Sequence, residues 1–277
     1  MNIETDPWKK ICDDLGISDG IDWFVSPTIS HETIRNYGRP EKLIPIYTLK
    51  QHRKHSFLFT NKLIPIRVGR GDAVLTKASL IQDVPRSSRN DSFSIKLSGK
   101  KSDAVQKFTR LTSDTEAKLL SIAYNHGVFS RAFNNSESWD YDLGIYGKMN
   151  LPKTEIGLVD FEGNKQFYGL SISNVQFELD FSLEDESNIF IIEAKVGAAK
   201  TFSSLQLFYP HLFLEDYAFE SGKKIRPILL LMQNFSKEKI DYKILEYGFW
   251  RSNVPNSLYL KGETNVSLIF SSQYYFS

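Results

Sequence analysis

Hydrophobic and polar residues alternate strictly over residues 175–182, with the apolar side chains on one face. A period of two is typical of a half-buried β-strand. An acidic turn at residues 184–188 follows, and an Ile-rich apolar run then leads to the triplet Glu-Ala-Lys at residues 193–195. Two such segments joined by a short polar turn predict a β-hairpin. Because its second strand is apolar on both faces, we expect that strand to be buried.

Start and stop residues predict the other elements. The predicted helices, of which the first three begin at a capping residue and end at Gly, are 6–16, 30–38, 113–127 and one from about residue 203. The run at residues 227–232 is wholly apolar and predicts a central strand that is reached by a crossover helix. Further strands are predicted near residues 244–249, 258–260 and 266–270.

These elements predict an α/β fold in two domains. The length of 277 residues suits one large or two modest domains, and a polar stretch at residues 83–103 indicates a linker or a loop that follows DNA. We therefore expect a first domain over residues 1–104 and a second, with a mixed sheet flanked by helices, over residues 105–277. Short helices followed by strands make the first domain a winged-helix-like or small α+β module.

Charged residues are distributed unevenly, although the net charge is only +1. Residues 1–110 carry 19 Lys and Arg against 12 Asp and Glu, whereas residues 111–277 carry 15 against 21. Within residues 30–110 the balance is 17 basic against 6 acidic side chains. A basic first part suits a protein that binds the phosphate backbone of DNA. Lysines that only keep a surface soluble are the alternative.

Two basic segments are candidates for DNA contact. Arg53 and Lys54 belong to a cluster at residues 50–55 that can line phosphates. Arg67 and Arg70 lie in a Gly-rich turn, from which a guanidinium can reach the edge of a guanine. Either segment can instead be a solvated loop.

Composition excludes several classes of site. Cys12 is the only cysteine, so the chain has no internal disulfide and no Cys-rich zinc site, and its five His residues show no ligand spacing. The sequence has no apolar run long enough to span a membrane and no signal-peptide pattern at its N-terminus, so we expect a cytoplasmic protein.

The predicted hairpin carries charged side chains in pairs. Residues two apart on a strand share a face, so Glu178 lies beside Asp180 and Glu193 lies beside Lys195. Pairing of the strands brings three carboxylates and one ammonium together, and carboxylates this close repel one another unless a divalent cation such as Mg²⁺ neutralises them. A lysine beside the metal can orient a water. These groups are the ones that metal-dependent phosphodiester hydrolysis needs, although a surface hairpin with cross-strand charges is the ordinary alternative.

At these residues the chain resembles the PD-(D/E)xK nuclease superfamily, and within it the type II restriction endonucleases. Asp180, Glu193 and Lys195 match the three positions of the motif, with Leu179 where Pro often precedes the first acid. Some restriction enzymes also carry a Gln-x-Glu-x-Asp strand and a later Gln-Leu-Tyr-Tyr-Pro helix, which match residues 176–180 and the Gln-Leu-Phe-Tyr-Pro segment that begins at Gln206. The likeness covers about residues 110–250.

The resemblance implies a restriction-endonuclease-like fold and Mg²⁺-dependent, sequence-specific cleavage of double-stranded DNA. Asp180 and Glu193 would hold the metal, Lys195 would position the attacking water and Gln206 would support them. A second metal would use Glu178 or Glu116, since such folds often supply a carboxylate from the helix before the motif. For Glu116 the alternative is a capping box with Ser113. A homodimer and a cognate DNA methyltransferase are the implied partners.

Two other functions remain open. The nearer is a nuclease of the same superfamily in DNA repair or recombination, and the sequence contains no Gly-x-x-x-x-Gly-Lys-Ser/Thr loop that would give it a motor of its own. The other is a non-catalytic DNA-binding regulator built on the basic domain. Clustered carboxylates argue against a regulator, because they repel DNA.

Overall fold

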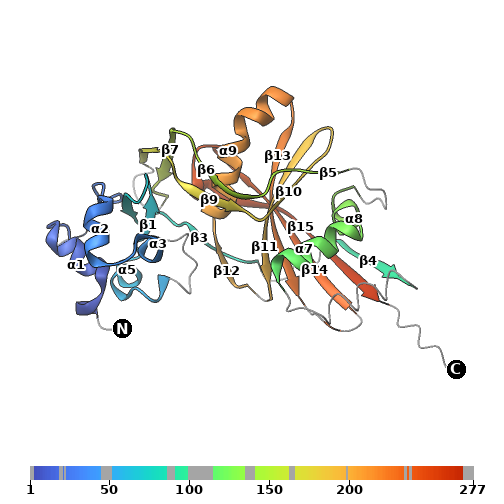
Figure 1. Cartoon of the computed structure of the whole chain (residues 1–277), viewed down its shortest axis with the longest axis horizontal. Coiled ribbons are helices and arrows are strands. Elements are labelled where there is room, and N and C mark those ends of the chain that lie inside the picture. Colours follow the sequence, from blue (N-terminus) through green and yellow to red (C-terminus); the bar gives the residue numbers. More distant parts are fainter. Residues whose placement is uncertain are drawn as a thin grey trace.

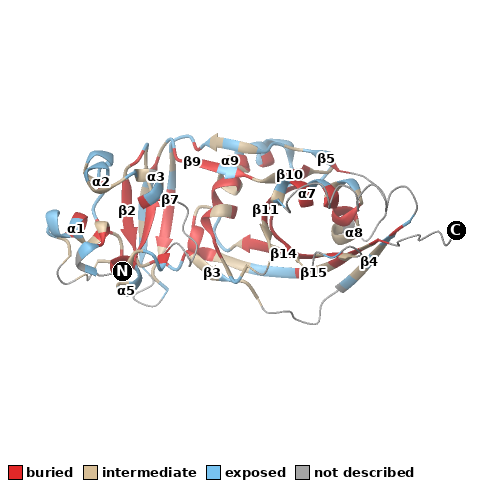
Figure 2. Ribbon diagram, turned by 60° about the horizontal axis from the view of Figure 1, so that its bottom comes forward, coloured by how far each residue is buried: buried red, intermediate tan, exposed pale blue. Residues whose placement is uncertain are grey.

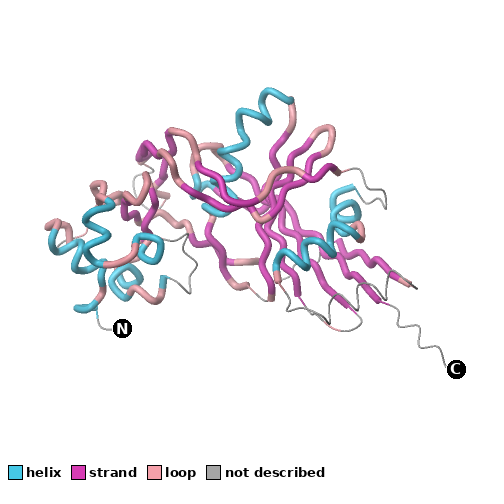
Figure 3. The backbone as a smooth tube through the Cα atoms, in the orientation of Figure 1, coloured by secondary structure: helices cyan, strands magenta, loops and turns pink. Residues whose placement is uncertain are grey.

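The computed structural model describes residues 3–18, 21, 23–44, 52–85, 91–98, 115–134, 141–161, 166–197, 199–233, 236 and 239–270. They form an α/β structure in which helices flank a curled mixed sheet (Figure 3). The N-terminal helices lie at one end of the molecule and the sheet occupies the other (Figure 1). No described helix is long and apolar enough to cross a membrane.

The first part of the chain consists of short helices followed by a two-stranded hairpin. Its elements are η1 (Ile3–Thr5), α1 (Pro7–Asp14), α2 (His31–Tyr37), α3 (Pro40–Leu43), α5 (Ser56–Thr60), β1 (Ile64–Arg67) and β2 (Ala73–Thr76). Asp6 begins α1 as predicted: its side chain accepts hydrogen bonds from the backbone amides of Trp8 at 3.0 Å and Phe57 at 2.9 Å. One buried carboxylate thus caps α1 and ties it to α5. The predicted helix at residues 30–38 is confirmed, with Ser30 as its N-cap.

The main sheet has seven strands in the order β4-β15-β14-β13-β11-β10-β5. Their bounds are β4 Asp91–Leu97, β5 Asp142–Leu143, β10 Phe181–Glu184, β11 Asn188–Val196, β13 Lys224–Gln233, β14 Lys239–Phe249 and β15 Leu258–Phe270. The expected central strand is confirmed as β13, which pairs in parallel with β11 and antiparallel with β14. The helix α9 (Leu205–Ser221) makes the crossover from β11 to β13. The two strands expected at 258–260 and 266–270 are one continuous strand, β15, entered through η2 (Pro255–Ser257).

Three two-stranded ribbons complete the described part of this region. They are β3 (Ile81–Asp83) with β12 (Thr201–Ser203), β6 (Gly147–Asn150) with β9 (Gln176–Leu179), and β7 (Thr154–Val159) with β8 (Phe167–Ile172). β3 and β4 precede residue 105, yet β3 pairs with β12 and β4 pairs in parallel with β15. The sheet region therefore takes residues from both sides of the expected domain boundary. Residues 91–97 of the expected linker form β4 and belong to the sheet, so the linker prediction is wrong there, while residues 86–90 and 99–103 lie outside the described residues.

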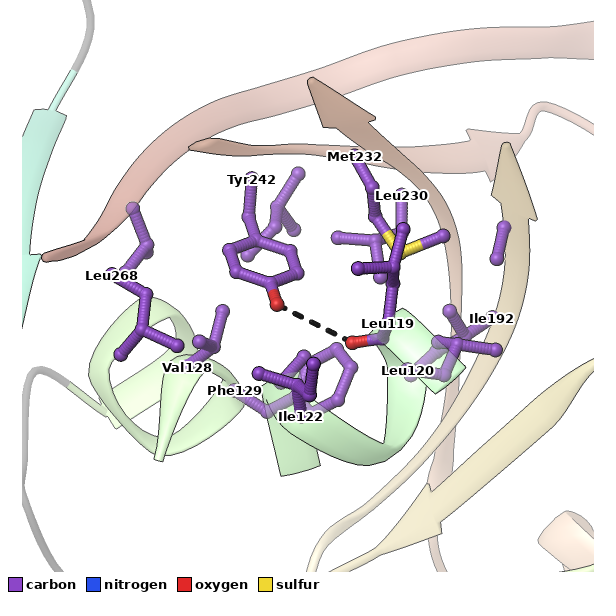
Figure 4. Close-up of a cluster of buried hydrophobic side chains, with 14 of the residues drawn as sticks. Leu119, Leu120, Ile122, Val128, Phe129, Ile192, Leu230, Met232, Tyr242 and Leu268 are labelled. Atoms are coloured by element: carbon purple, nitrogen blue, oxygen red, sulfur yellow. Dashed lines mark hydrogen bonds between the residues drawn. The ribbon is translucent and has the colours of Figure 1, made fainter. Parts of the chain in front are cut away.

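Helices cover both faces of the sheet. One face packs against α7 (Glu116–Asn125) and α8 (Val128–Asn134), where Leu119, Leu120 and Phe129 meet the even-numbered residues of β11. Figure 4 shows this core, in which the Tyr242 hydroxyl donates to the carbonyl oxygen of Leu119 at 3.3 Å. The other face packs against α9, whose apolar residues meet the odd-numbered Ile189 and Ile191. Alternation along β11 therefore places Glu193 and Lys195 on the α9 face.

Burial follows this layering (Figure 2), with buried segments along β11, β13 and the inner side of α9 and exposed residues on the outer helices of the first part. Every residue of β11 from Ile189 to Ala194 is buried. The expectation that the second hairpin strand is buried is confirmed.

Candidate active site

The charged residues of the hairpin lie where its two strands separate. β10 and β11 pair antiparallel from Glu184 opposite Ile189 to Phe181 opposite Ile192. The predicted first strand is interrupted at Asp180, because β9 leaves the sheet there to pair with β6. The Oδ2 atom of Asp180 accepts a hydrogen bond from the backbone amide of Ala194 at 2.9 Å. Asp180 is thereby fixed beside the end of β11 that carries Glu193 and Lys195.

Glu193 is the most deeply buried carboxylate of this group, with 6% of its surface exposed. Its Oε1 atom accepts hydrogen bonds from the Lys195 ammonium and from the Gln206 side-chain amide. The Oε1 atom of Gln206 in turn accepts from the backbone amide of Ser203 at 3.2 Å. The first turn of α9 and the end of β12 therefore hold Gln206 against Glu193.

Lys195 is the cation at the centre of the group. Its Nζ atom also donates to the carbonyl oxygen of Ala194 at 3.0 Å and lies 4.0 Å from Oε1 of Glu116. Burial works against the charged form of Lys195, but the charge and hydrogen bond of Glu193, together with the charges of Glu116 and Asp180, outweigh it and the pKa of Lys195 is raised. The lysine is therefore held as an ammonium.

The carboxylates repel one another across this ammonium. Burial raises the pKa of Glu193, an effect that Lys195 opposes and Asp180 reinforces. Burial also raises the pKa of Glu116, with Asp180 and Glu178 adding to the shift and Lys195 opposing it. The charges of Glu193, Glu116 and Asp180 all act on the one lysine. The site has an excess of negative charge that a cation would relieve.

Glu116 reaches the site from α7, but not as the residue of a Ser113 capping box. The N-cap of α7 is Thr115, whose hydroxyl accepts from the backbone amide of Lys118 at 3.3 Å. Glu116 is consequently the first residue of the helix rather than the third, and Ser113 lies outside the described residues. The capping-box interpretation is wrong, because the sequence offers two nearby hydroxyl caps and the second one is used.

Glu178 stands at the margin of the site. It is exposed on β9, opposite Lys148 of β6, and shares a strand face with Gln176 and Asp180 by alternation. The structure thus brings Asp180, Glu193, Lys195, Gln206 and Glu116 together and leaves Glu178 on the open side.

The oxygen atoms of the site suit a hard divalent cation in type and number. Among the described residues no three acidic, His or Cys side chains are arranged to hold a metal ion. Mg²⁺, however, is usually held by only one or two carboxylates together with water and substrate phosphates. Asp180 and Glu193 provide two carboxylates, each with one oxygen that accepts no hydrogen bond from the described residues. The donor set therefore fits Mg²⁺ at Asp180 and Glu193.

The candidate DNA contacts of the first part differ in exposure. Arg53 and Lys54 are exposed in the turn before α5, with the Arg53 guanidinium 5.8 Å from the centre of the Phe59 ring. Lys50 lies outside the described residues. Arg70 is exposed in the turn between β1 and β2, as expected for that Gly-rich segment. Arg67 is half-buried, and its Nη2 atom donates to the carbonyl oxygen of Ile44 at 3.2 Å.

Residues 79–266 match the family described as a domain of unknown function, DUF6997. The chain belongs to this family. No curated protein and no solved structure matches the chain. The DUF6997 segment contains β3, the motif hairpin, Glu116 and Gln206, whereas Arg53, Lys54, Arg67 and Arg70 precede it. The acidic site is thus part of the shared family region, and the candidate DNA contacts are not.

Sequence reasoning missed the backbone groups that fix the site. The amides of Ala194 and Ser203 orient Asp180 and Gln206, and Thr115 sets the position of Glu116. Backbone amides have no sequence signature. A signal for Thr115 existed, because Thr is a preferred N-cap residue directly before an acidic residue and an apolar periodic run.

Proposed function

We propose that this protein is a Mg²⁺-dependent endodeoxyribonuclease with a restriction-endonuclease-like fold, cutting double-stranded DNA at a specific sequence as type II restriction enzymes do. The observation that carries the proposal is the convergence of Asp180, Glu193 and Lys195 where the hairpin strands part, with Gln206 bonded to Glu193. The order of these residues along two paired strands and a crossover helix is the order of the PD-(D/E)xK motif.

Each side chain has a role that its surroundings support. Asp180 and Glu193 would hold Mg²⁺, which supplies positive charge against a phosphodiester and promotes ionisation of water. Lys195 has its ammonium beside Glu193 and within 4.0 Å of Glu116, so it would orient the attacking water and offset charge on the phosphate. Gln206 holds the Glu193 carboxylate in place. Glu116 or Glu178 would contribute to a second metal.

A purely structural ion pair is the main competing interpretation. Such a pair needs one carboxylate for each ammonium, whereas the fields of Asp180, Glu193 and Glu116 all act on Lys195. Asp180 and Glu116 are partly exposed, and the repulsion of these surplus carboxylates from one another and from Glu193 costs folding free energy unless a cation joins them. The surplus supports the metal site over the structural pair.

The proposal is tested by incubating the purified protein with plasmid and with bacterial genomic DNA in Mg²⁺ or in EDTA. We expect Mg²⁺-dependent cleavage into discrete fragments. Lys195→Ala should lower the rate by about 100-fold or more while DNA binding in EDTA persists. Lys200→Ala, a change at an exposed lysine of the same segment, is the matched control and should cleave normally.

The product pattern separates the alternatives. Unspecific degradation would favour a repair or recombination nuclease, and specific binding without cleavage would favour a regulator. Full cleavage by Lys195→Ala would remove Lys195 from the mechanism. Discrete fragments would also call for a two-fold dimer on a symmetric target, and for a DNA methyltransferase that protects the host.

A further inference from the structure

A small cavity of about 80 Å³ lies where the β1–β2 hairpin meets β9 and α9. Of the described residues that line it, Arg67, Gln176 and Tyr209 are polar and the others are apolar. Arg67 comes from the end of β1, Gln176 from the start of β9 and Tyr209 from the second turn of α9. The cavity therefore joins the first part of the chain to the elements that carry Asp180 and Gln206.

Tyr209, one of the residues that line this cavity, carries an unsatisfied donor. The residue is 1% exposed, and its buried hydroxyl has no hydrogen-bond partner within the described part of the chain. A buried hydroxyl without a partner costs about 1–3 kcal/mol, and native structures rarely tolerate one without water or a ligand.

Arg67 adds a cation with donors to spare. A guanidinium has five N–H donors, and one of those of Arg67 is used by the Ile44 carbonyl. Burial raises the pKa of Tyr209, while the charge of Arg67 opposes that shift, so the guanidinium is close enough to act on the phenol. Among the described residues, no carboxylate lines the cavity.

Donors from a guanidinium, a phenol and an amide around a small space select an oxyanion. A planar guanidinium matches phosphate oxygens in a two-pronged geometry. The volume of about 80 Å³ exceeds the roughly 10–15 Å³ that one water molecule needs, so the cavity has room for a small tetrahedral anion.

The cavity also lies near the acidic site. Gln176 and Asp180 are four residues apart on one strand path, which is about 13 Å at the rise of an extended strand. One strand of duplex DNA advances about 3.4 Å for each nucleotide. A phosphate in the cavity would therefore be a few nucleotides from one held at Lys195.

We propose that the cavity formed by Arg67, Gln176 and Tyr209 binds a phosphate oxyanion, either a backbone phosphate of bound DNA or free phosphate. The assignment of the phosphate to bound DNA rests on the proposed function, whereas the phosphate site itself does not depend on it. In this assignment Arg67 positions the DNA backbone and does not read a base.

Calorimetric titration with inorganic phosphate, in EDTA and without DNA, tests the site. We expect the unaltered protein to bind phosphate, and Arg67→Ala and Tyr209→Phe each to weaken binding about tenfold or more, since each removes a donor to a charged ligand. Arg35→Ala, a change at an exposed arginine of α2, should bind as the unaltered protein does. Tyr209→Phe keeps the ring, so its thermal stability in phosphate-free buffer should not fall. Absence of phosphate binding, or binding that neither variant weakens, overturns the site.

A second arm identifies the source of the phosphate. In EDTA, a duplex oligonucleotide is titrated into the same variants, with and without added inorganic phosphate. Weaker DNA binding by both variants, and competition by phosphate only in the unaltered protein, assigns the site to the DNA backbone. If both variants bind DNA as the unaltered protein does but bind inorganic phosphate more weakly, the site is assigned to free phosphate. Because neither arm requires cleavage, a protein that binds phosphate here but never cuts DNA would refute the nuclease and keep the site.

Discussion

At the scale of single residues, the pair of Glu193 and Lys195 should contribute to the free energy of unfolding. Lys195 neutralises a carboxylate that is 6% exposed, and removing one member of a buried pair leaves the other uncompensated. Lys195→Met should therefore destabilise the fold by about 2–3 kcal/mol in EDTA. Urea unfolding measures the loss.

The double variant Glu193→Gln/Lys195→Met completes this test. With both charges gone, the unfolding free energy should return to within about 1 kcal/mol of the unaltered value. Lys200→Met, on an exposed side chain, controls for the loss of a lysine. If Lys195→Met unfolds at the same urea concentration as the unaltered protein, Glu193 is not held as a buried partner of Lys195.

His211 gives the fold a dependence on pH. Both ring nitrogens are buried without hydrogen-bond partners among the described residues, and the ring lies 5.1 Å from that of Phe249. Burial, with a smaller effect from Lys261, lowers the pKa of His211 from 6.5 to about 4. His211 in the unfolded chain therefore takes up a proton near pH 6.5, whereas in the folded chain it takes one up only near pH 4. The free energy of unfolding consequently falls as the pH drops below 6.5, and the loss is complete below pH 4.

Between pH 7 and pH 5 the predicted loss from His211 is about 2 kcal/mol. His211→Leu should remove this part of the pH dependence and leave the contributions of the carboxyl groups, including Glu193 and Glu116 with their raised pKa values, unchanged. Urea unfolding of both proteins at the two pH values checks it. Equal losses in the two proteins would mean that His211 is protonated in the folded state.

At the scale of elements, the start of α7 decides where Glu116 lies. Thr115 caps the helix through its hydroxyl, so Thr115→Ala should cost about 1 kcal/mol in unfolding free energy. Thr115→Ser keeps the hydroxyl and should cost little. Loss of the cap should also reduce Mg²⁺-dependent cleavage if Glu116 assists the site. Unchanged stability of Thr115→Ala would show that Thr115 does not cap the helix and would return the capping role to Ser113.

Elements that depend on local pattern were predictable from the sequence, whereas those that depend on distant pairing were not. Alternation and apolar runs correctly gave the hairpin, the central strand β13 and the capped helix α1. The break at Asp180 was not predictable, because it arises when β9 pairs with β6. The partners of β3 and β4 are likewise set by strands more than 100 residues later, and no local period encodes such a choice.

The candidate site followed the same rule. The spacing of Asp180, Glu193 and Lys195 was sufficient to bring them together, since strand alternation and a tight turn fix their relative positions. Gln206 was placed beside them by the resemblance to restriction enzymes, and the structure bonds its side-chain amide to Glu193. The engagement of Arg67 with the Ile44 carbonyl could not be foreseen, since it depends on how α3 packs on the hairpin.

At the scale of the whole molecule, charge is divided between two regions. The positive excess lies within residues 30–110, whereas the residues of the acidic site, from Glu116 onward, follow it in the sequence. For the proposed nuclease this division lets one region attract the DNA backbone while the other holds carboxylates that would repel it without a metal. The two regions should therefore respond differently to salt and to Mg²⁺.

The salt dependence of DNA binding measures the basic region directly. Arg53 and Lys54 are both exposed, and removing one ion pair with a DNA phosphate should reduce the slope of log affinity against log salt by about 0.9. Arg53→Glu/Lys54→Glu should then make the slope shallower by about 2 and weaken binding at low salt. Fluorescence anisotropy with a duplex oligonucleotide in EDTA, at several salt concentrations, provides both quantities. The control Lys153→Glu/Arg251→Glu reverses two exposed charges outside residues 30–110 and should keep the slope. Equal slopes in the Arg53/Lys54 variant and the unaltered protein would show that this cluster does not touch phosphates and would leave DNA binding to other side chains.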